Sequence, residues 1–115
     1  MTESVRHGPI RTVEKLWGTE TWFVNTELYC YKRLRILAGK CSSKHFHKVK
    51  DETFCVVAGT VSVELEGTVL VLGRGDSIRI KPRQIHRFWG DGIVEEISTH
   101  HSDEDVVRLE ESKNL

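Results

Sequence analysis

The chain has 115 residues, which is the length of one domain and too short for a second domain with its own core. Its 17 Lys and Arg residues balance its 17 Asp and Glu residues, so no basic excess favours nucleic acid or an anionic membrane as a partner. A net charge near zero gives little repulsion between copies and weakly favours an oligomer.

Residues 1–16 contain no apolar stretch typical of a signal peptide, and no apolar run is long enough for a membrane-spanning helix. Cys30, Cys41 and Cys55 are odd in number and lack C-x-x-C spacing. We interpret them as reduced thiols that act as small core residues, which predicts a cytoplasmic protein.

Along the chain, short β-rich runs are separated by turn signals, and no useful helical period occurs before residue 102. The clearest run alternates Val61, Val63 and Leu65 with polar residues, as a half-buried strand does. The predicted strands are residues 21–24, 28–38, 44–47, 53–58, 60–66, 68–72, 77–81, 85–89 and 93–98, with turns at Gly59, Gly67, 73–76 and 90–92. This pattern predicts an all-β antiparallel sandwich or barrel.

One domain, 1–115, is expected to have three parts. Residues 1–27 form N-terminal strands or an arm, residues 28–100 form the barrel core, and residues 101–115 form a tail. The tail carries acidic residues and a small cluster of Val106, Val107 and Leu109. We expect it to form a short helix or strand packed on the barrel, followed by a disordered end.

Four side chains predict a metal site: His45, His47, Glu52 and His86. A His-x-His pair on a strand places both imidazoles on one face, because strand side chains alternate. Three imidazoles and one carboxylate suit a divalent first-row metal and leave positions open for water or substrate. The expected cofactor is one divalent transition metal, with Mn, Fe, Ni, Co and Zn all allowed.

The spacing around these residues resembles the two motifs of the cupin superfamily. The first motif runs from Gly39 through His45, His47 and Glu52 to Gly59, and the second runs from Gly75 to His86. In the second motif, Lys81 replaces a usual proline and Arg83 a usual glycine, and both changes affect a turn. The resemblance implies a jelly-roll barrel, the four metal ligands above and a homodimer.

A narrower resemblance covers most of the chain. The segments Lys15-LWGTETW, Lys32-RLRILAG, Asp51-ETFCVVAGTVSV and Asp103-EDVVRLEE are similar to the cupin domain of type II mannose-6-phosphate isomerases and related sugar isomerases. Those isomerases carry a glutamine at the position of His45. The resemblance implies a small-molecule substrate, such as a sugar or sugar phosphate.

Candidate catalytic residues are Glu95 and Glu96 on a late strand, of which one must point inward and could act as a general base. His100 and His101 follow this strand and are interpreted as exposed or loop residues, with a catalytic role as the alternative. Trp17, Trp22 and Trp89 are interpreted as core or interface residues rather than platforms for stacking a sugar. Trp17, Trp22 and Phe23 lie close together in sequence and predict a homodimer through the N-terminal third.

Basic residues near the ligands either form a rim that captures a phosphate or carboxylate, or lie on a solvated outer face. Alternation places Lys44 and Lys48 opposite the histidines and turns Arg87 away from His86. Arg33 and Arg35 would bind an anion if their face lines the cavity. The full set near the ligands is Lys44, Lys48, Lys50, Arg83 and Arg87.

Three functions remain open. A sugar or sugar-phosphate isomerase would work through an enediolate, with a second inward carboxylate near the metal. An oxidative cupin would combine Fe or Mn with an apolar cavity. A binding or storage module without catalysis would close its cavity over the metal.

Overall fold

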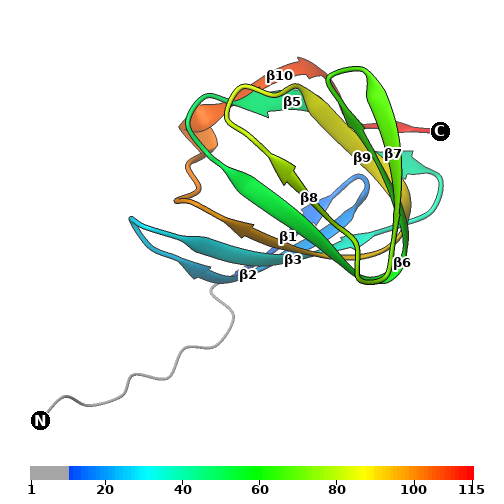
Figure 1. Cartoon of the computed structure of the whole chain (residues 1–115), viewed down its shortest axis with the longest axis horizontal. Coiled ribbons are helices and arrows are strands. Elements are labelled where there is room, and N and C mark those ends of the chain that lie inside the picture. Colours follow the sequence, from blue (N-terminus) through cyan, green and yellow to red (C-terminus); the bar gives the residue numbers. More distant parts are fainter. Residues whose placement is uncertain (1–10) are drawn as a thin grey trace, which may run out of the picture.

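The computed structural model describes residues 11–115 as one curled antiparallel sheet (Figure 1). Its elements are β1 (Arg11–Lys15), β2 (Gly18–Asn25), β3 (Cys30–Ile36), β4 (Lys40–Cys41), β5 (Lys44–His47), β6 (Glu52–Leu65), β7 (Thr68–Gly73), β8 (Ser77–Ile80), β9 (His86–Ser98), the 3₁₀ turn η1 (Asp103–Asp105), β10 (Val106–Glu110) and β11 (Lys113–Asn114). No α-helix occurs in this part of the chain, which confirms the all-β prediction. Residues 1–10, part of the expected N-terminal arm and of the segment searched for a signal peptide, lie outside the described residues.

Two long strands, β6 and β9, pair with each other and run through both halves of the barrel. The turns predicted at Gly59 and residues 90–92 are wrong, because the chain bends there without leaving the sheet. A β-carbon on Gly59 would lie 2.1 Å from the carbonyl oxygen of Asp91, and one on Gly92 would lie 2.5 Å from that of Ala58. The facing glycines therefore let the two backbones approach and bend together.

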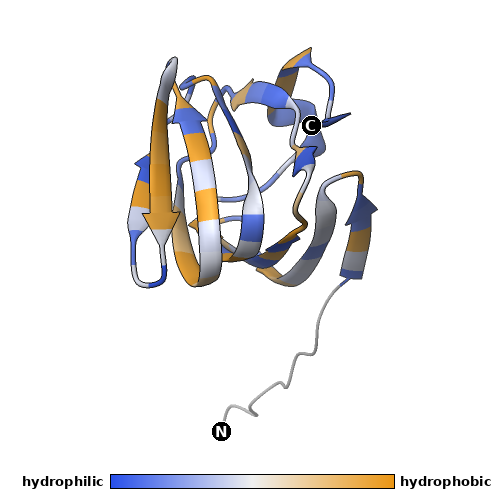
Figure 2. Ribbon diagram, turned by 90° about the vertical axis from the view of Figure 1, so that its right-hand side faces the viewer, coloured by the Kyte–Doolittle hydropathy of each residue, from blue (hydrophilic) through white to orange (hydrophobic). Residues whose placement is uncertain are grey.

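Each end of the two long strands has its own neighbours. Near the last residues of β9, the order is β1, β2, β3, β9, β6 and β8. Near the first residues of β9, it is β10, β5, β9, β6 and β7. Figure 2 shows apolar and polar residues alternating along these strands. The inward apolar side chains form one core, which consists of Trp17, Leu34, Ile36, Phe54, Val56, Val61, Val63, Ile80, Phe88 and Val94.

The C-terminal tail belongs to the sheet. Of the two alternatives for it, the strand is confirmed, because β10 pairs with β5. The expected disordered end is wrong, since β11 pairs with β4 and the backbone N–H of Leu115 donates to the carbonyl of Gly39 at 2.8 Å. This pairing satisfies backbone groups that an isolated tail would leave to water.

Trp17 and Trp22 are only 5% and 7% exposed and pack inside their own barrel, so neither offers a surface to a second copy. Cys30 and Cys41 are buried and Cys55 is half-buried, and all three are free thiols, as predicted. From residue 11 onward, no helix has the length and apolar character needed to cross a membrane.

Candidate metal centre

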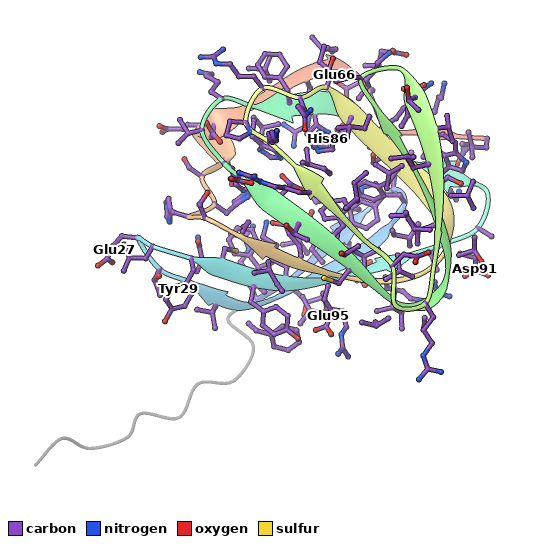
Figure 3. All side chains as sticks on the ribbon, viewed as in Figure 1. Glu27, Tyr29, Glu66, His86, Asp91 and Glu95 are labelled. Atoms are coloured by element: carbon purple, nitrogen blue, oxygen red, sulfur yellow. The ribbon has the colours of Figure 1, made fainter. Side chains whose placement is uncertain are left out.

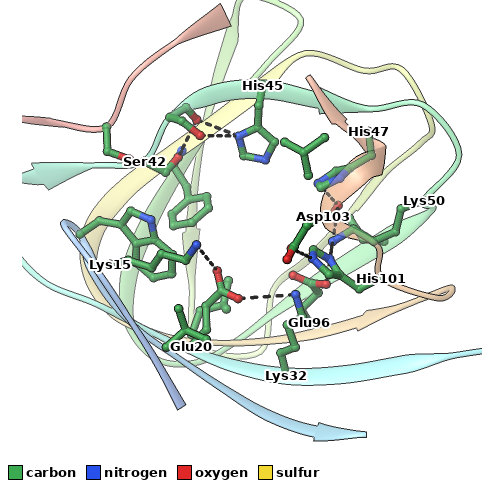
Figure 4. A pocket seen from close by; sticks show the side chains of 18 of the residues that line it. Lys15, Glu20, Lys32, Ser42, His45, His47, Lys50, Glu96, His101 and Asp103 are labelled. Atoms are coloured by element: carbon green, nitrogen blue, oxygen red, sulfur yellow. Dashed lines mark hydrogen bonds and ion pairs between the residues drawn. The ribbon is translucent and has the colours of Figure 1, made fainter. Parts of the chain in front are cut away.

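Three histidines converge at one end of the barrel. His45 and His47 lie on β5, and His86 begins β9, which pairs with β5 through His45 and His86. One nitrogen from each imidazole lies within 4.8 Å of the other two. His86 lies inside the barrel (Figure 3), and His45 and His47 face the same cavity (Figure 4). The structure therefore brings together all three histidines predicted as metal ligands.

Neighbouring carbonyl groups fix which imidazole nitrogen is free. Nδ1 of His45 lies 2.9 Å from the carbonyl oxygen of Ser43, and Nδ1 of His86 lies 2.9 Å from that of Gln84. A carbonyl only accepts, so each Nδ1 carries the proton and each Nε2 keeps its lone pair. Nε2 of His86 is buried and has no hydrogen-bond partner among residues 11–115. A buried lone pair without a partner is costly, and a metal ion would satisfy it.

The fourth predicted ligand, Glu52, begins β6 and is 2% exposed. Its carboxylate is not part of the group of mutually close histidine nitrogens, but its Oε2 lies 3.1 Å from Nε2 of His47. Two ligand atoms about 2.1 Å from one ion and at right angles lie about 3.0 Å apart. The measured separation therefore fits two adjacent ligands, and the donor set fits a divalent transition metal.

The electrostatics keep these groups in the form that binds metal. Burial, together with the other two histidines, lowers the pKa of His45 to about 3. Burial likewise lowers the pKa of His86, so both imidazoles are neutral at pH 7. Burial acts against the charged form of Glu52, but the ammonium group of Lys50 and the neighbouring His47 and His86 outweigh it and hold the pKa of this carboxyl well below its usual range. Neutral imidazoles and an ionised carboxylate need not release a proton on binding.

Lys50 connects the metal site to a second buried carboxylate. Its ammonium group lies 3.0 Å from Oε2 of Glu96, 3.2 Å from Nδ1 of His101 and 3.4 Å from Oε2 of Glu52. The loop before β6 is held by Asp105, whose carboxylate accepts the backbone N–H of Lys50 at 3.0 Å. Burial disfavours the charged lysine, but Glu96 and Glu52 outweigh this and raise its pKa. Lys50 therefore stays positively charged.

The two candidate bases lie on opposite faces of β9, as alternation predicts. Glu96 is 4% exposed and faces the cavity. Glu95 lies on the outer side of the sheet, where it accepts a hydrogen bond from Tyr31 and lies 3.7 Å from Arg33 (Figure 3). Only Glu96 can act inside the barrel.

Most of the suspected basic rim points away from the cavity. Arg87 and Lys44 contact Glu64 at 2.9 and 3.9 Å, and Lys48 is exposed. Arg83 adopts a positive φ of 68°, which a glycine at this position would accept more easily, and its N–H donates to the carbonyl of His47 at 2.7 Å. Lys50 alone of this set lines the cavity within the described chain.

The sequence interpretation missed two groups that face the cavity. Lys32 is 2% exposed and lines it, whereas Arg33 and Arg35 lie on the other face. Lys32 and Leu34 are two residues apart on one strand, so they share a face. This spacing could have revealed the inward position of Lys32, because the apolar Leu34 points inward. His101 was interpreted as an exposed or loop residue; it does lie in the loop after β9, but it is not exposed.

His101 lines the cavity with a side chain 10% exposed, and its Nε2–H donates to Asp103 at 2.9 Å. Burial, then the charges of Lys32 and Lys50, lower its pKa to about 4. No local sequence pattern indicates this placement, because it depends on how the segment after β9 folds over the barrel mouth. The complete cavity has a volume of about 420 Å³ and extends from the histidines to exposed Arg11 and Arg108.

Comparison with known proteins agrees with this description. Residues 33–104 match the cupin domain family. The chain is 32% identical over 110 residues to mannose-1-phosphate guanylyltransferase of Sinorhizobium fredii, which covers 90% of this chain and 22% of that protein. It is 32% identical over 111 residues to ManC, the mannose-1-phosphate guanylyltransferase of Salmonella typhimurium, with 91% and 23% covered. The chain thus spans under a quarter of the length of these relatives.

Solved structures share the fold. A variant of Streptomyces Pac13 with uridine superposes with a TM-score of 0.84 at 14% identity, covering 95% of this chain and 93% of that one. KdgF from Halomonas sp. gives 0.71 at 22% identity, with 78% and 84% covered. Oxalate decarboxylase from Bacillus subtilis gives 0.76 at 16% identity, with 95% and 33% covered. The match to the family, with this fold and the clustered histidines, shows that the chain belongs to the cupin family.

Proposed function

We propose that this cupin binds one divalent transition metal, from among Mn, Fe, Ni, Co and Zn, and isomerises a sugar or sugar phosphate by moving a proton between adjacent carbons. The observation that carries the proposal is the second buried carboxylate, Glu96, which Lys50 links to Glu52 beside the histidines. An isomerase needs a base next to the site that binds the carbonyl.

His45, His47, Glu52 and His86 would hold the metal. When bound, the ion would act as a Lewis acid and polarise the substrate carbonyl. Glu96 would take the proton from C2, beside the carbonyl, and return it to C1, while the hydroxyl proton on the C2 oxygen passes to the C1 oxygen, so that the aldehyde becomes a ketone. The ammonium group of Lys50 would orient Glu96 through its 3.0 Å contact and stabilise negative charge that develops on substrate oxygens.

The character of the cavity favours this function over the other two. An oxidative cupin was expected to have an apolar cavity, but charged side chains line much of this one. A storage module was expected to close over the metal, but the cavity reaches exposed arginines. The two guanylyltransferases, by their names, act on a mannose phosphate, which is the chemical class of substrate proposed.

Solvent exchange tests the proposal. Metal-loaded protein incubated in D₂O with aldoses and aldose phosphates should replace the C2 proton with deuterium, as followed by proton NMR. Exchange should disappear in His47→Ala and Glu96→Gln and persist in Glu95→Gln, the matched control on the outer face. Exchange that survives in Glu96→Gln rejects this base, and no exchange with any sugar rejects the isomerase.

We also infer a homodimer, now through the outer face of the β3–β9 region. Phe23 stacks on Tyr31 with ring centroids 5.0 Å apart, and Ile97, opposite Tyr31 in the register, is 56% exposed. Apolar side chains on an exposed sheet face favour association. Light scattering should return twice the monomer mass of 13.2 kDa, and Ile97→Lys should shift the protein to monomer.

A further inference from the structure

The wall of the cavity opposite His45 carries a second charged group, separate from the metal ligands (Figure 4). It is centred on Lys32, which lies between Trp22 on β2 and Glu96 on β9 in the sheet register. The ammonium nitrogen of Lys32 lies 4.0 Å from the Trp22 ring centroid and 3.5 Å from Oε1 of Glu20. Lys32 is 2% exposed, so its charge has been removed from water.

The two inward lysines differ in how well they are satisfied. An ammonium group can donate three hydrogen bonds. Lys50 has three polar partners, at 3.0 to 3.4 Å. Lys32 has one within the described chain, the long contact to Glu20. A buried ammonium group with unused N–H donors that faces a cavity can bind a ligand by donating hydrogen bonds to its oxygen atoms.

Glu20 alone cannot balance the positive charge on this wall of the cavity. The carboxylate of Glu20 also accepts from Nε1 of Trp22 at 3.0 Å and lies 3.8 Å from the ammonium of Lys15. Burial acts against its charged form, but Lys32 and Lys15 outweigh it and lower its pKa, so Glu20 is ionised at neutral pH. One carboxylate thus faces two lysines.

The whole cavity shows the same excess of positive charge. The guanidinium carbon of Arg11 lies 4.4 Å from the Trp22 ring centroid, and Trp22 stands between Arg11 on β1 and Lys32 on β3 in the sheet register. The cavity lining holds five basic and four acidic residues: Arg11, Lys15, Lys32, Lys50 and Arg108 against Glu20, Glu52, Glu96 and Asp103. A divalent ion on the histidines would add two further positive charges. Such a cavity attracts an anion.

We propose that Lys32 forms a subsite for the anionic group of the substrate, a phosphate monoester or a carboxylate at the far end of a sugar. This inference rests on the proposed function and deepens it, because the sugar would span from this subsite to the metal ligands. The cavity volume of about 420 Å³ lies within the range of small-molecule sites. Of the two alternatives that the sequence left for the basic residues near the ligands, the solvated outer face fits most of them, and Lys32 takes the role considered for a rim.

Calorimetric titration of the full chain tests the subsite, with Zn²⁺ added and separately with chelator. Glucose 6-phosphate should bind more tightly than glucose in both conditions. Lys32→Met should weaken glucose 6-phosphate about tenfold or more and leave glucose unchanged, because a charge-assisted hydrogen bond is lost. Lys32→Arg should retain most of the affinity. The control Lys81→Met removes the same charge from an exposed position and should change nothing.

Glucuronate separates the two anions. If Lys32→Met weakens glucuronate more than glucose 6-phosphate, the subsite takes a carboxylate, and the reverse assigns it to phosphate. Either outcome supports the proposal. Equal affinity for glucose and both anions, no binding of either anion, or unchanged binding in Lys32→Met overturns it.

A purely structural role for Lys32 predicts a different result. If Lys32 served only to neutralise Glu20, the double variant Glu20→Gln/Lys32→Met would recover both the melting temperature and anion binding. Recovery of the melting temperature without anion binding supports the subsite, and recovery of both overturns it. Loss of anion binding in Lys32→Met, with no C2 exchange for any sugar, would reject the isomerase while keeping the subsite. C2 exchange in the parent protein, together with anion binding that Lys32→Met leaves unaltered, would reject the subsite while keeping the isomerase.

Discussion

Replacing Lys50 with methionine removes a buried cation that contacts two buried carboxylates. Lys50, Glu52 and Glu96 are 3%, 2% and 4% exposed. Removing one partner of a buried ion pair costs about 3–5 kcal/mol, because the remaining charge stays in a poorly solvated site. A surface pair would cost about 0–1 kcal/mol. We therefore expect Lys50→Met to lower the free energy of unfolding of the metal-free protein by about 3–5 kcal/mol.

The structure also predicts what restores stability. Lys50→Met/Glu96→Gln should recover part of the loss, because the amide needs no counter-charge, and the pair should be non-additive by about 0.5–3 kcal/mol. Adding divalent metal should recover a further part, since the ion would neutralise Glu52. Glu52 has a lowered pKa, so the stability it contributes is present at neutral pH and is lost as the pH falls below its ordinary value of 4.5.

Urea unfolding at pH 7 in chelator, followed by tryptophan fluorescence, measures these differences. Lys48→Met is the matched control, because Lys48 is exposed, and it should stay within about 0.5 kcal/mol of the parent protein. A loss below about 1 kcal/mol for Lys50→Met, or equal losses for both variants, would refute the reasoning that the three charges depend on one another.

Three further outcomes follow from the described geometry. Arg83→Gly should exceed Arg83→Ala in free energy of unfolding by about 1 kcal/mol, because φ is positive at this residue, and equal stabilities in chemical denaturation would show that the backbone relaxes. The metal-free protein should lose stability as the pH falls from 7 to 4. The pKa values of His45 and His86 are lowered in the folded protein, so over this range the unfolded chain binds protons that the folded chain does not. Urea midpoints that do not change with pH would contradict this. Zn²⁺ at about 100 times its Kd should stabilise the metal-free protein by about 2.7 kcal/mol, measured as a rise in melting temperature. His86→Ala should lose this rise and the exposed control His100→Ala should keep it, and the reverse result would place the metal elsewhere.

Local alternation predicted one half of the histidine site, and the resemblance to the second cupin motif supplied His86. His45 and His47 share a face because they are two residues apart on one strand, and the glutamates at 95 and 96 must diverge for the same reason. The order of short strands and turns also predicted the all-β class. These features depend on neighbours in the sequence, so they could be derived without knowledge of the tertiary structure.

Long-range pairing decided what the sequence interpretation missed. Lys32 faces the cavity because β3 pairs with β2 and β9 in one register, and a shift of one residue would turn it outward. Gly59 and Gly92 looked like turn residues, but each faces the other across β6 and β9, so they mark a bend. His101 reaches the cavity only because the segment after β9 crosses the barrel mouth. The position of Lys32 has a partial local signature, because it shares a strand face with Leu34, whereas the bend and the position of His101 have none.

The barrel mouth has a weakly paired boundary between β5 and β9, called the seam below. β5 pairs with β10 along most of its length but with β9 through the single pair His45 and His86. The three candidate histidine ligands stand on both sides of this seam, with His45 and His47 on β5 and His86 on β9. An ion held by all three would act as a crosslink between a two-stranded ribbon and the body of the barrel. Metal occupancy would then control how often the ribbon opens, so the mouth would be slowest to exchange its amide protons when loaded and fastest when empty.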